Sequence, residues 1–351
     1  MKNNFTFFEQ ILHQLTINNA FFNELSFDME QSLFLKKAKA IEPKIIFVSG
    51  LARSGTTSIL NHLVNSQVGN SLTYKDLPFL FMPNLRNQWA GKNMTSSPLK
   101  ERAHGDNILI NEGSPEAIDE IFWKFQLSGR YIQKVFLDLH DLSERDLLAF
   151  KYFVQLHLYK HKSSTYLTKN NNSILRYHSL KTLHKFQAFF IFALREPLSH
   201  AKSLLKQHQL FSQLHQEDAF SLTYFNSMGH YEFGSNQKPF NFKNEVLNQQ
   251  LKQTDKFSLQ YWLLSWLNYY QYLFDNFAAE DVLVDFDDLC EFPNEIIQHI
   301  ADKWQLNKLD ITFKRYPKPN HLTQDESNLD ELMDACQTLY LKLKALCISV
   351  N

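Results

Sequence analysis

A short segment near the N-terminus contains the residue types that bind a phosphate-like anion. It reads Gly-Leu-Ala-Arg-Ser-Gly-Thr-Thr over residues 50–57, and it fits the nucleotide-binding pattern G-x-x-x-x-G-K-[ST] except that Thr56 stands in place of the lysine. Backbone N–H groups of such a loop, with the N-terminus of the helix that follows, form a cradle for an anion. Arg53 adds a fixed positive charge. The residues expected to contact the anion are Arg53, Ser54, Gly55, Thr56, Thr57 and Ser58.

The missing lysine indicates which anion fits this loop. In enzymes that bind nucleoside triphosphates, that lysine is a main partner of the β- and γ-phosphates, which arrive with Mg²⁺. A 5′-phosphosulfate is shorter and carries less charge on its transferred group, so one arginine with N–H and hydroxyl donors suffices. We therefore expect no metal ion. The competing interpretation is a tight strand-to-helix turn without a ligand.

A second group of anion-binding residues follows the apolar run 188–194. Arg195 comes directly after this predicted strand, and Pro197 suits the first turn of the helix that we expect over 197–211. Ligands of α/β sheets lie at the carboxyl ends of the strands. Ser203 lies two turns into the helix, so Arg195 and Ser203 are placed to grip a second phosphate.

Together the two motifs resemble those of the sulfotransferases that use 3′-phosphoadenosine 5′-phosphosulfate (PAPS). That family pairs an R-S-G-T-T loop with a later strand, an R-[DE]-P sequence and a serine eight residues after the arginine, as found here at Arg53 and from Arg195 to Ser203. The resemblance implies that the first loop holds the 5′-phosphosulfate and that Arg195 and Ser203 hold the 3′-phosphate. It also implies a fold similar to that of the P-loop NTPases.

Weaker similarities extend the resemblance over about residues 44–305. The segment 284–293 resembles the family's strand, acidic turn and proline-initiated helix, and residues 168–170 resemble a lysine-containing turn of the bacterial members. Lys169 is thus a candidate to contact the sulfuryl oxygens, with a solvated lysine as the alternative. Cytosolic animal members have lysine where this chain has Arg53, so it is more similar to the bacterial and carbohydrate-type members.

The alternation of strands and helices predicts how these motifs are positioned. Short apolar, β-branched runs predict buried parallel strands at 44–49, 164–168, 188–194 and 282–286. Helices are expected at 5–25, 28–40, 58–65, 115–127, 143–161, 173–185, 197–211, 257–277 and 327–347. This order predicts an α/β fold with three layers, in which helices flank a central, mostly parallel sheet.

We expect a single domain over residues 1–351. Its predicted parts are a helical N-terminal extension (1–43), a core with the PAPS site (44–305), a surface insertion or lid within that core (226–256), and a C-terminal segment and helix (306–351). The acceptor pocket is expected from 71–130 and 205–256, which mix aromatic and polar residues. The aromatic stretch 261–270 is interpreted as helix packing.

In-line sulfuryl transfer needs a base that takes the proton of the acceptor. His104 has an ordinary pKa of about 6.5, which suits neutral pH. Glu116 follows a proline in a segment similar to one that carries an acidic base in some bacterial members, and Asp76 follows the first strand–helix unit, where other members place a carboxylate. We rank the candidates in the order His104, Glu116, Asp76; the alternative for each is an ordinary surface or helix-capping residue.

Composition limits the class of protein. The chain has 351 residues, of which 44% are hydrophobic, enough for a substantial core. A net charge of −1 excludes a global attraction to nucleic acid or to an anionic membrane. Three cysteines lack metal-ligand spacing, and we find no signal peptide or membrane-spanning run, so we expect a cytoplasmic protein.

The sequence therefore predicts an enzyme, a PAPS-dependent sulfotransferase. Its acceptor is expected to be a hydroxyl or amine of a carbohydrate or a small metabolite. Two alternatives stay open. The first is a P-loop nucleotide kinase or other NTPase, for which Asp285 is the strand-end candidate to bind a metal. The second is a non-catalytic nucleotide-binding relative.

Overall fold

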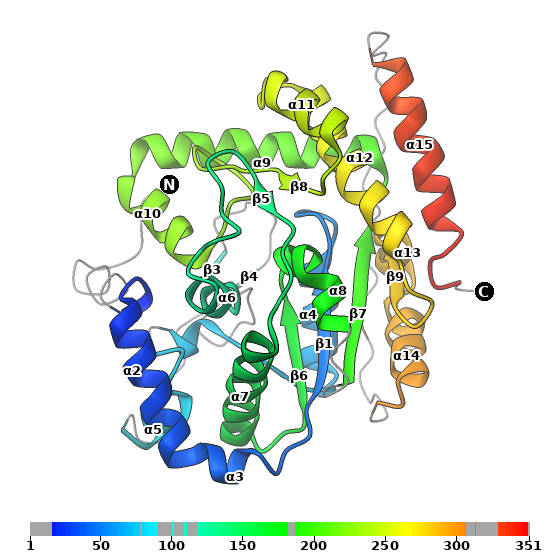
Figure 1. Ribbon diagram of the computed structural model, residues 1–351. Helices are drawn as coiled ribbons and strands as arrows, with labels where there is room; N and C mark the ends of the chain where they lie inside the picture. Colours follow the sequence, from blue (N-terminus) through cyan, green and yellow to red (C-terminus); the bar gives the residue numbers. More distant parts are fainter. Residues whose placement is uncertain are drawn as a thin grey trace.

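The computed structural model describes residues 16–77, 79–89, 118–181, 187–306, 313 and 329–349, and the backbone of 100–101 and 109–110. Within these residues, five parallel strands form a central sheet in the order β2-β6-β1-β7-β9 (Figure 1). The strands are β1 (Lys44–Ser49), β2 (Asn70–Ser71), β6 (Thr165–Lys169), β7 (Gln187–Leu194) and β9 (Val282–Asp285). Two short pairs lie apart from it: β3 (Lys100–Glu101) with β4 (Leu109–Ile110), and β5 (Leu137–Asp138) with β8 (Phe240–Asn241).

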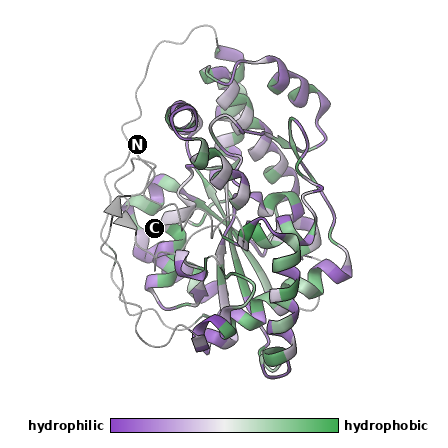
Figure 2. Ribbon diagram, turned by 90° about the vertical axis from the view of Figure 1, so that its left-hand side faces the viewer, coloured by the Kyte–Doolittle hydropathy of each residue, from purple (hydrophilic) through white to green (hydrophobic). Residues whose placement is uncertain are grey.

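The central strand β1 is buried on both faces because its residues after Lys44 are apolar up to Ser49. Ile45 and Phe47 pack into one core cluster, and Ile46 and Val48 pack into a second cluster on the opposite face. Figure 2 shows the hydrophobic sheet between helices whose outer faces are hydrophilic.

Helices cover both faces of the sheet, which confirms the predicted α/β fold with flanking helices. The first cluster includes side chains of α7 (Glu144–His161), α9 (Pro197–Glu217) and α12 (Leu259–Asn276), and the second includes those of α4 (Thr56–Asn65) and α14 (Pro293–Lys303). The other helices of the described residues are α2 (Ala20–Glu30), η1 (Gln31–Leu35), α3 (Lys36–Ala38), η2 (Tyr74–Asp76), α5 (Pro83–Trp89), α6 (Glu120–Gln126), η3 (Asn171–Arg176), α8 (Tyr177–Lys181), α10 (Ala219–Met228), α11 (Glu245–Gln253), α13 (Phe286–Glu291) and α15 (Asp330–Lys344).

Several boundaries differ from the sequence prediction. The helix expected over 173–185 is instead the 3-10 helix η3 followed by the short helix α8. The side chain of Asn170 accepts a hydrogen bond from the N–H of Asn172, and this local turn replaces the first turn of an α-helix. The N-terminal helices do not separate near residue 27, since α2, η1 and α3 form one continuous helical run. The polar stretch 226–256 contains the end of α10, then β8 and α11.

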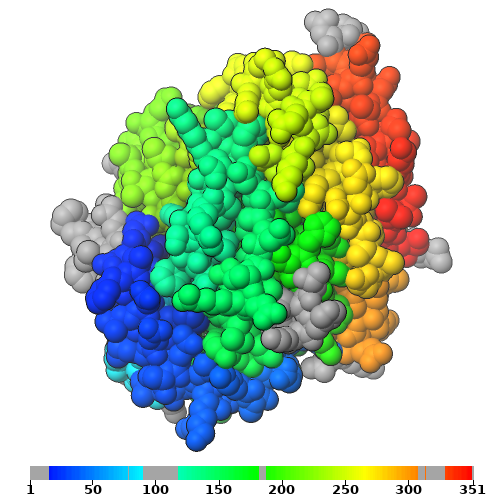
Figure 3. All heavy atoms as spheres, in the orientation of Figure 1, coloured from blue at the N-terminus to red at the C-terminus, as the bar shows by residue number. Residues whose placement is uncertain are grey.

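The C-terminal helix α15 packs against α9 and α12. In the space-filling view it lies along one side of the molecule, and α2 lies on the other (Figure 3). Across the described part of the chain, no helix has the length and apolar character that crossing a membrane requires.

Candidate functional site

The loop between β1 and α4 has the backbone shape of an anion cradle. Arg53 and Gly55 both have positive φ angles, of 70° and 101°. Gly55 is the N-cap residue of α4, and no side chain caps this end of the helix within the described residues. By contrast, Ser143 and Ser258 cap α7 and α12 with their own hydroxyls. No capping side chain therefore competes with an anion for this end of α4.

Glycine is required at position 55 for two reasons. A φ of 101° is strained for any residue with a Cβ atom. A Cβ atom built there would also lie 2.5 Å from the ring of Phe286, which follows β9. The close approach places the loop against the residue that follows β9, two strands away from β1 in the sheet.

The two predicted anion motifs meet at this loop. Arg53 Nε donates to Ser203 Oγ at 3.4 Å, and Arg195 Nη1 donates to the carbonyl oxygen of Arg53 at 3.1 Å. These contacts join residues that are more than 140 positions apart in sequence, 150 and 142 respectively. Both arginines and Ser203 therefore form one polar site at the carboxyl ends of β1 and β7.

The charge of this site favours an anion. Burial, and then the positive charge of Arg53, lower the pKa of Arg195 from its ordinary value. The Nε atom of Arg195 is buried and has no hydrogen-bond partner within the described residues. Two neighbouring guanidinium groups with an unused donor fit a phosphate, which accepts several hydrogen bonds and neutralises both charges.

Aromatic and histidine side chains hold Arg195 and the loop in place. Trp266 Nε1 donates to the carbonyl oxygen of Arg195 at 3.1 Å, and the hydroxyl of Tyr270 donates to that of Ala193 at 2.8 Å. His200 Nε2 donates to the carbonyl oxygen of Ala52 at 2.7 Å. Burial, and then the charge of Arg195, lower the pKa of His200 to about 3, so its ring is neutral at pH 7.

Sequence reasoning missed these supporting residues. The aromatic stretch 261–270 was interpreted as helix packing alone, and its buried residues do pack in the core, but Trp266 and Tyr270 also hydrogen bond to the end of β7. The signal in the sequence is a pair of aromatic residues, one turn apart, whose side chains can donate hydrogen bonds. The sequence alone does not identify the backbone atom that each side chain contacts.

Asp285 has a structural role that occupies both of its oxygens. Its carboxylate accepts from the N–H groups of Asp287 and Asp288 and so caps α13. It also accepts from the hydroxyl of Tyr340 at 2.8 Å and lies 2.7 Å from Lys344 Nζ. These contacts leave little of the carboxylate for the Mg²⁺ of an NTPase, which weighs against that alternative.

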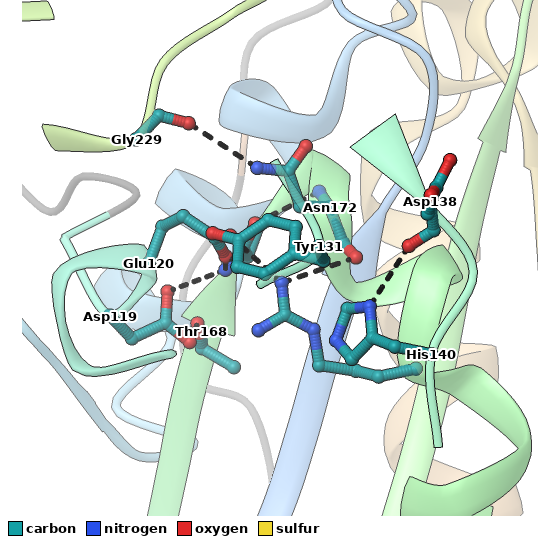
Figure 4. A network of polar contacts seen from close by, with 10 residues as sticks. Asp119, Glu120, Tyr131, Asp138, His140, Thr168, Asn172 and Gly229 are labelled. Carbon is teal, nitrogen blue, oxygen red and sulfur yellow. Dashed lines mark hydrogen bonds and ion pairs between the residues drawn. The ribbon is translucent and has the colours of Figure 1, made fainter. Parts of the chain in front are cut away.

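On the other side of β1, the end of β6 carries a buried polar network (Figure 4). Thr168 Oγ1 donates to Asp119 at 2.7 Å, and Asn170 Nδ2 donates to both Asp119 and Glu120, at 3.2 and 2.7 Å. Arg176 forms an ion pair with Glu120 at 2.7 Å, and both side chains are buried. Burial, with a further contribution from the charge of Glu120, raises the pKa of Asp119 to about 6. Lys169, in register with Val48 of β1, follows Thr168 and is mostly buried.

Of the three candidate bases, the described residues include Asp76. His104 and Glu116 lie outside the described residues, so both stay predictions. Asp76 lies in η2, where it accepts from the N–H of Thr73 at 2.8 Å and forms an ion pair with Lys160 at 2.6 Å. Although burial acts to raise it, the charge of Lys160 and these hydrogen bonds hold the pKa of Asp76 at about 2. A carboxylate so weakly basic, with its oxygens engaged, is a poor general base at neutral pH.

A small hollow adjoins the loop. Leu51 and Ala52 line it directly before Arg53, and Leu204 lines it directly after Ser203. Trp262 of α12 and the segment 231–240 form further parts of its wall. The second stretch expected to form an acceptor pocket, 205–256, thus contributes to this wall; the described lining contains no residue of the first stretch, 71–130.

Among the comparisons with known proteins, only the one with solved structures finds matches. No protein-family model matches the chain, and no curated protein matches it. The structure matches those of bacterial sulfotransferases. Sulfotransferase STF1 from Mycobacterium tuberculosis H37Rv is 12% identical, with a TM-score of 0.47, over 95% of this chain and 81% of that one. Sulfotransferase STF9 from Mycobacterium avium has the same identity and TM-score, over 100% and 81%. The sulfotransferase domain of the Synechococcus PCC 7002 olefin synthase is 15% identical, with a TM-score of 0.33, over 89% and 96%. Because the identities and TM-scores are this low, the function must be argued from the contacts of the site itself.

Proposed function

We propose that this chain is a PAPS-dependent sulfotransferase, a single-domain enzyme that transfers a sulfuryl group to a hydroxyl or amine of a carbohydrate or small metabolite. The observation that carries the proposal is the meeting of Arg53, Arg195 and Ser203 at an uncapped helix N-terminus. This arrangement offers two adjoining anion sites, as a nucleotide with a 5′-phosphosulfate and a 3′-phosphate requires.

Each residue of the donor site has a proposed role. The N–H groups and hydroxyls of Gly55, Thr56, Thr57 and Ser58 bind the 5′-phosphosulfate, and Ser54 shapes the loop as a fully buried residue. Arg53 neutralises the charge that develops on the bridging oxygen, and Lys169, which pairs with Val48 at the end of β6, contacts the sulfuryl oxygens. Arg195 and Ser203 bind the 3′-phosphate.

The transfer itself is an in-line displacement at sulfur. The acceptor oxygen or nitrogen forms a bond to sulfur while the bond between sulfur and the bridging phosphate oxygen breaks, and 3′,5′-adenosine bisphosphate leaves. A general base takes the acceptor proton. We propose His104 or Glu116 for this role ahead of Asp76, because Asp76 is engaged by Lys160. In the sequence, Glu116 precedes by three residues the buried Asp119, which accepts from Thr168 near the end of β6. We also propose a cytoplasmic location, since the three cysteines are free thiols.

The decisive experiment is calorimetric titration with 3′,5′-adenosine bisphosphate and, separately, with ATP and Mg²⁺. We expect micromolar binding of the bisphosphate, weak binding of ATP, and a loss of about 100-fold in bisphosphate affinity in Arg195→Ala, because a charge-assisted pair is removed. Arg145→Ala, on the exposed surface of α7, is the control and should bind normally. Preference for ATP with Mg²⁺, or full affinity in Arg195→Ala, would bring the NTPase alternative forward. Tight bisphosphate binding without transfer from PAPS to any acceptor would favour the non-catalytic alternative.

A further inference from the structure

The hollow beside the loop has a mainly apolar wall that joins four parts of the fold. Leu51 comes from the phosphate loop, Leu204 from α9, Trp262 from α12, and Tyr231 and Phe240 from the segment that ends in β8. Because Leu51 and Leu204 are direct neighbours of Ala52–Arg53 and Ser203, a molecule in the hollow lies against the anion site.

Two buried amide oxygens in this wall have no donor. Asn171 and Asn268 are 4% and 3% exposed, and the Oδ1 atom of each lacks a hydrogen-bond partner within the described residues. The partners of the other amide atom show which atom of each side chain is the oxygen. Asn268 Nδ2 donates to the carbonyl oxygen of Phe240 at 2.9 Å, and Asn171 Nδ2 donates to the carboxylate of Glu232 at 3.1 Å. Both of those oxygens only accept, so the atom left over on each asparagine is the acceptor Oδ1. A buried acceptor without a donor is unfavourable, and a ligand that supplies donors relieves it.

The charged groups of the wall already have partners. The Glu232 carboxylate accepts from Asn171, and Lys238 Nζ donates to the carbonyl oxygen of Lys134 at 2.7 Å. Gln237 accepts from the hydroxyl of Tyr261 at 2.8 Å. The Lys238 ammonium keeps its charge but is directed to Lys134, which does not line the hollow. A negatively charged ligand inside the hollow would therefore meet two amide oxygens and the Glu232 carboxylate, which repel it.

The sheet order places one wall of the hollow, Asn171, on the opposite side of β1 from Phe286. Asn171 follows β6, which pairs with one edge of β1, while Phe286 follows β9 beyond β7 on the other edge. Lys169, the proposed contact of the sulfuryl group, precedes Asn171 on the same side.

From these contacts we propose that the hollow is the acceptor pocket and that Asn171 and Asn268 select its ligand. The ligand class is a hydroxylated ring compound without negative charge, whose apolar face lies on Trp262 and Leu204 and whose hydroxyl groups donate to the two amide oxygens. This inference rests on the proposed function, because it assigns the second substrate of that reaction.

The test is calorimetric titration of the protein saturated with 3′,5′-adenosine bisphosphate. The probes form two matched pairs: catechol with its carboxylate 3,4-dihydroxybenzoate, and methyl β-glucoside with methyl β-glucuronide. We expect at least one neutral probe to bind, and its carboxylate counterpart to bind at least about 10-fold more weakly. Which pair responds distinguishes an aromatic from a sugar acceptor.

Variants then test whether the two asparagines cause the preference for a neutral ligand. Asn171→Leu and Asn268→Leu should each weaken the neutral probe by about 10-fold or more and leave bisphosphate affinity unchanged. Asn248→Leu is the matched control, because Asn248 is also 3% exposed, donates to Asn241 at 2.8 Å and has an Oδ1 without a partner in the described chain, but does not line the hollow.

Several results would overturn the inference while leaving the donor site intact. They are equal binding of neutral and anionic probes, no binding of any neutral probe to the bisphosphate-loaded protein, or unchanged probe affinity in a folded Asn268→Leu variant. Loss of bisphosphate affinity in parallel with probe affinity would assign the hollow to the donor instead. Failure of the bisphosphate itself to bind the unaltered protein would count against the proposed function. The comparison of neutral and anionic probes needs no variant, so it stands even if a substitution prevents folding.

Discussion

The two sides of β1 differ in the kind of polar group that they bury. On the β7 side, Arg195 and Arg53 bring two cations to an uncapped helix N-terminus. On the β6 side, Asp119 and Glu120 bring two carboxylates that only Arg176 balances as an ion pair among the contacts of the described residues. At the carboxyl ends of the strands, the β7 side therefore presents hydrogen-bond donors for an anion. The β6 side presents hydrogen-bond acceptors for a group that carries a proton.

This contrast suits a reaction that joins an anionic donor to a hydroxylated acceptor. Under the proposed function, the β7 side with its two arginines would bind a nucleotide whose phosphates need donors. The β6 side, rich in hydrogen-bond acceptors, would bind a molecule that must lose a proton. The reacting centre would lie between them, above the carboxyl end of β1. The predictions below test whether the two sides have separate roles, beginning with the largest expected effect.

Replacing the general base should separate turnover from nucleotide affinity most clearly. We expect replacing the true base, by His104→Ala or Glu116→Gln, to reduce turnover by about 10²- to 10⁴-fold while the affinity for 3′,5′-adenosine bisphosphate changes little. Turnover is measured as transfer from radiolabelled PAPS, and affinity by calorimetry. Asp76→Asn is the comparison variant. It should lower the free energy of unfolding, because Lys160 loses its partner, and should change turnover little. A collapse of turnover in Asp76→Asn at unchanged stability would reverse our ranking.

The positive side depends on the shape of the loop as well as on its charges. Gly55→Ala should reduce bisphosphate affinity by about 100-fold, because the new Cβ atom would lie 2.5 Å from the Phe286 ring and would require a φ of 101°. Gly129→Ala is a matched control for backbone strain. Its φ is also positive, at 64°, but a Cβ atom there would meet nothing closer than Ile132 at 3.7 Å. Normal bisphosphate binding by Gly55→Ala would show that the cradle does not need this approach.

The motifs in the sequence were sufficient to predict that Arg53, Arg195 and Ser203 lie together. The spacing of Arg53, Arg195 and Ser203 is local to two strand–helix junctions, and a parallel sheet brings such junctions together. Their supports could not be predicted, because the contact of His200 with Ala52 spans 148 positions and depends on how α9 packs. The two asparagines of the hollow belonged to no motif for the same reason. Asn171 looked like part of a polar turn and Asn268 like part of an aromatic helix, and only their shared hollow relates them.

Asp76 and Asp119 should make opposite contributions to stability as pH changes. The pKa of Asp76 is lowered from the usual 3.8 to about 2, so its contribution is present above pH 4 and is lost as pH falls toward 2. The pKa of Asp119 is raised from 3.8 to about 6, so stability is instead lost as pH rises from about 4 to 6. Each shift of about two pKa units corresponds to about 2–3 kcal/mol.

Urea unfolding between pH 3 and pH 7 measures both slopes. Asp119→Asn should remove the loss of stability with rising pH, and Asp76→Asn should remove the loss with falling pH. If Asp119→Asn leaves the slope between pH 4 and 6 unchanged, the negative side does not hold the extra proton that its buried carboxylates imply.

The smallest expected effect concerns the C-terminal helix, which supports the positive side from a distance. Tyr340 and Lys344 of α15 hold Asp285, Asp285 caps α13, and the first residue of α13, Phe286, packs against Gly55 and lies 4.9 Å from the Arg195 guanidinium. Tyr340→Phe and Lys344→Ala should therefore weaken bisphosphate binding by about 3- to 10-fold without touching the nucleotide, because each removes one hydrogen bond or ion pair worth about 1 kcal/mol to the position of Phe286. Probe binding in the acceptor hollow should not change.

Lys342→Ala controls for the loss of a lysine on the same helix, since Lys342 is exposed and its nearest aromatic contact is 5.9 Å away at Phe274. If Tyr340→Phe weakened probe and bisphosphate equally, α15 would support the whole sheet edge, and the separation of the two sides would not extend to their supports. If Tyr340→Phe weakened the binding of the bisphosphate alone, the C-terminal helix and Phe286 would support only the anion-binding loop.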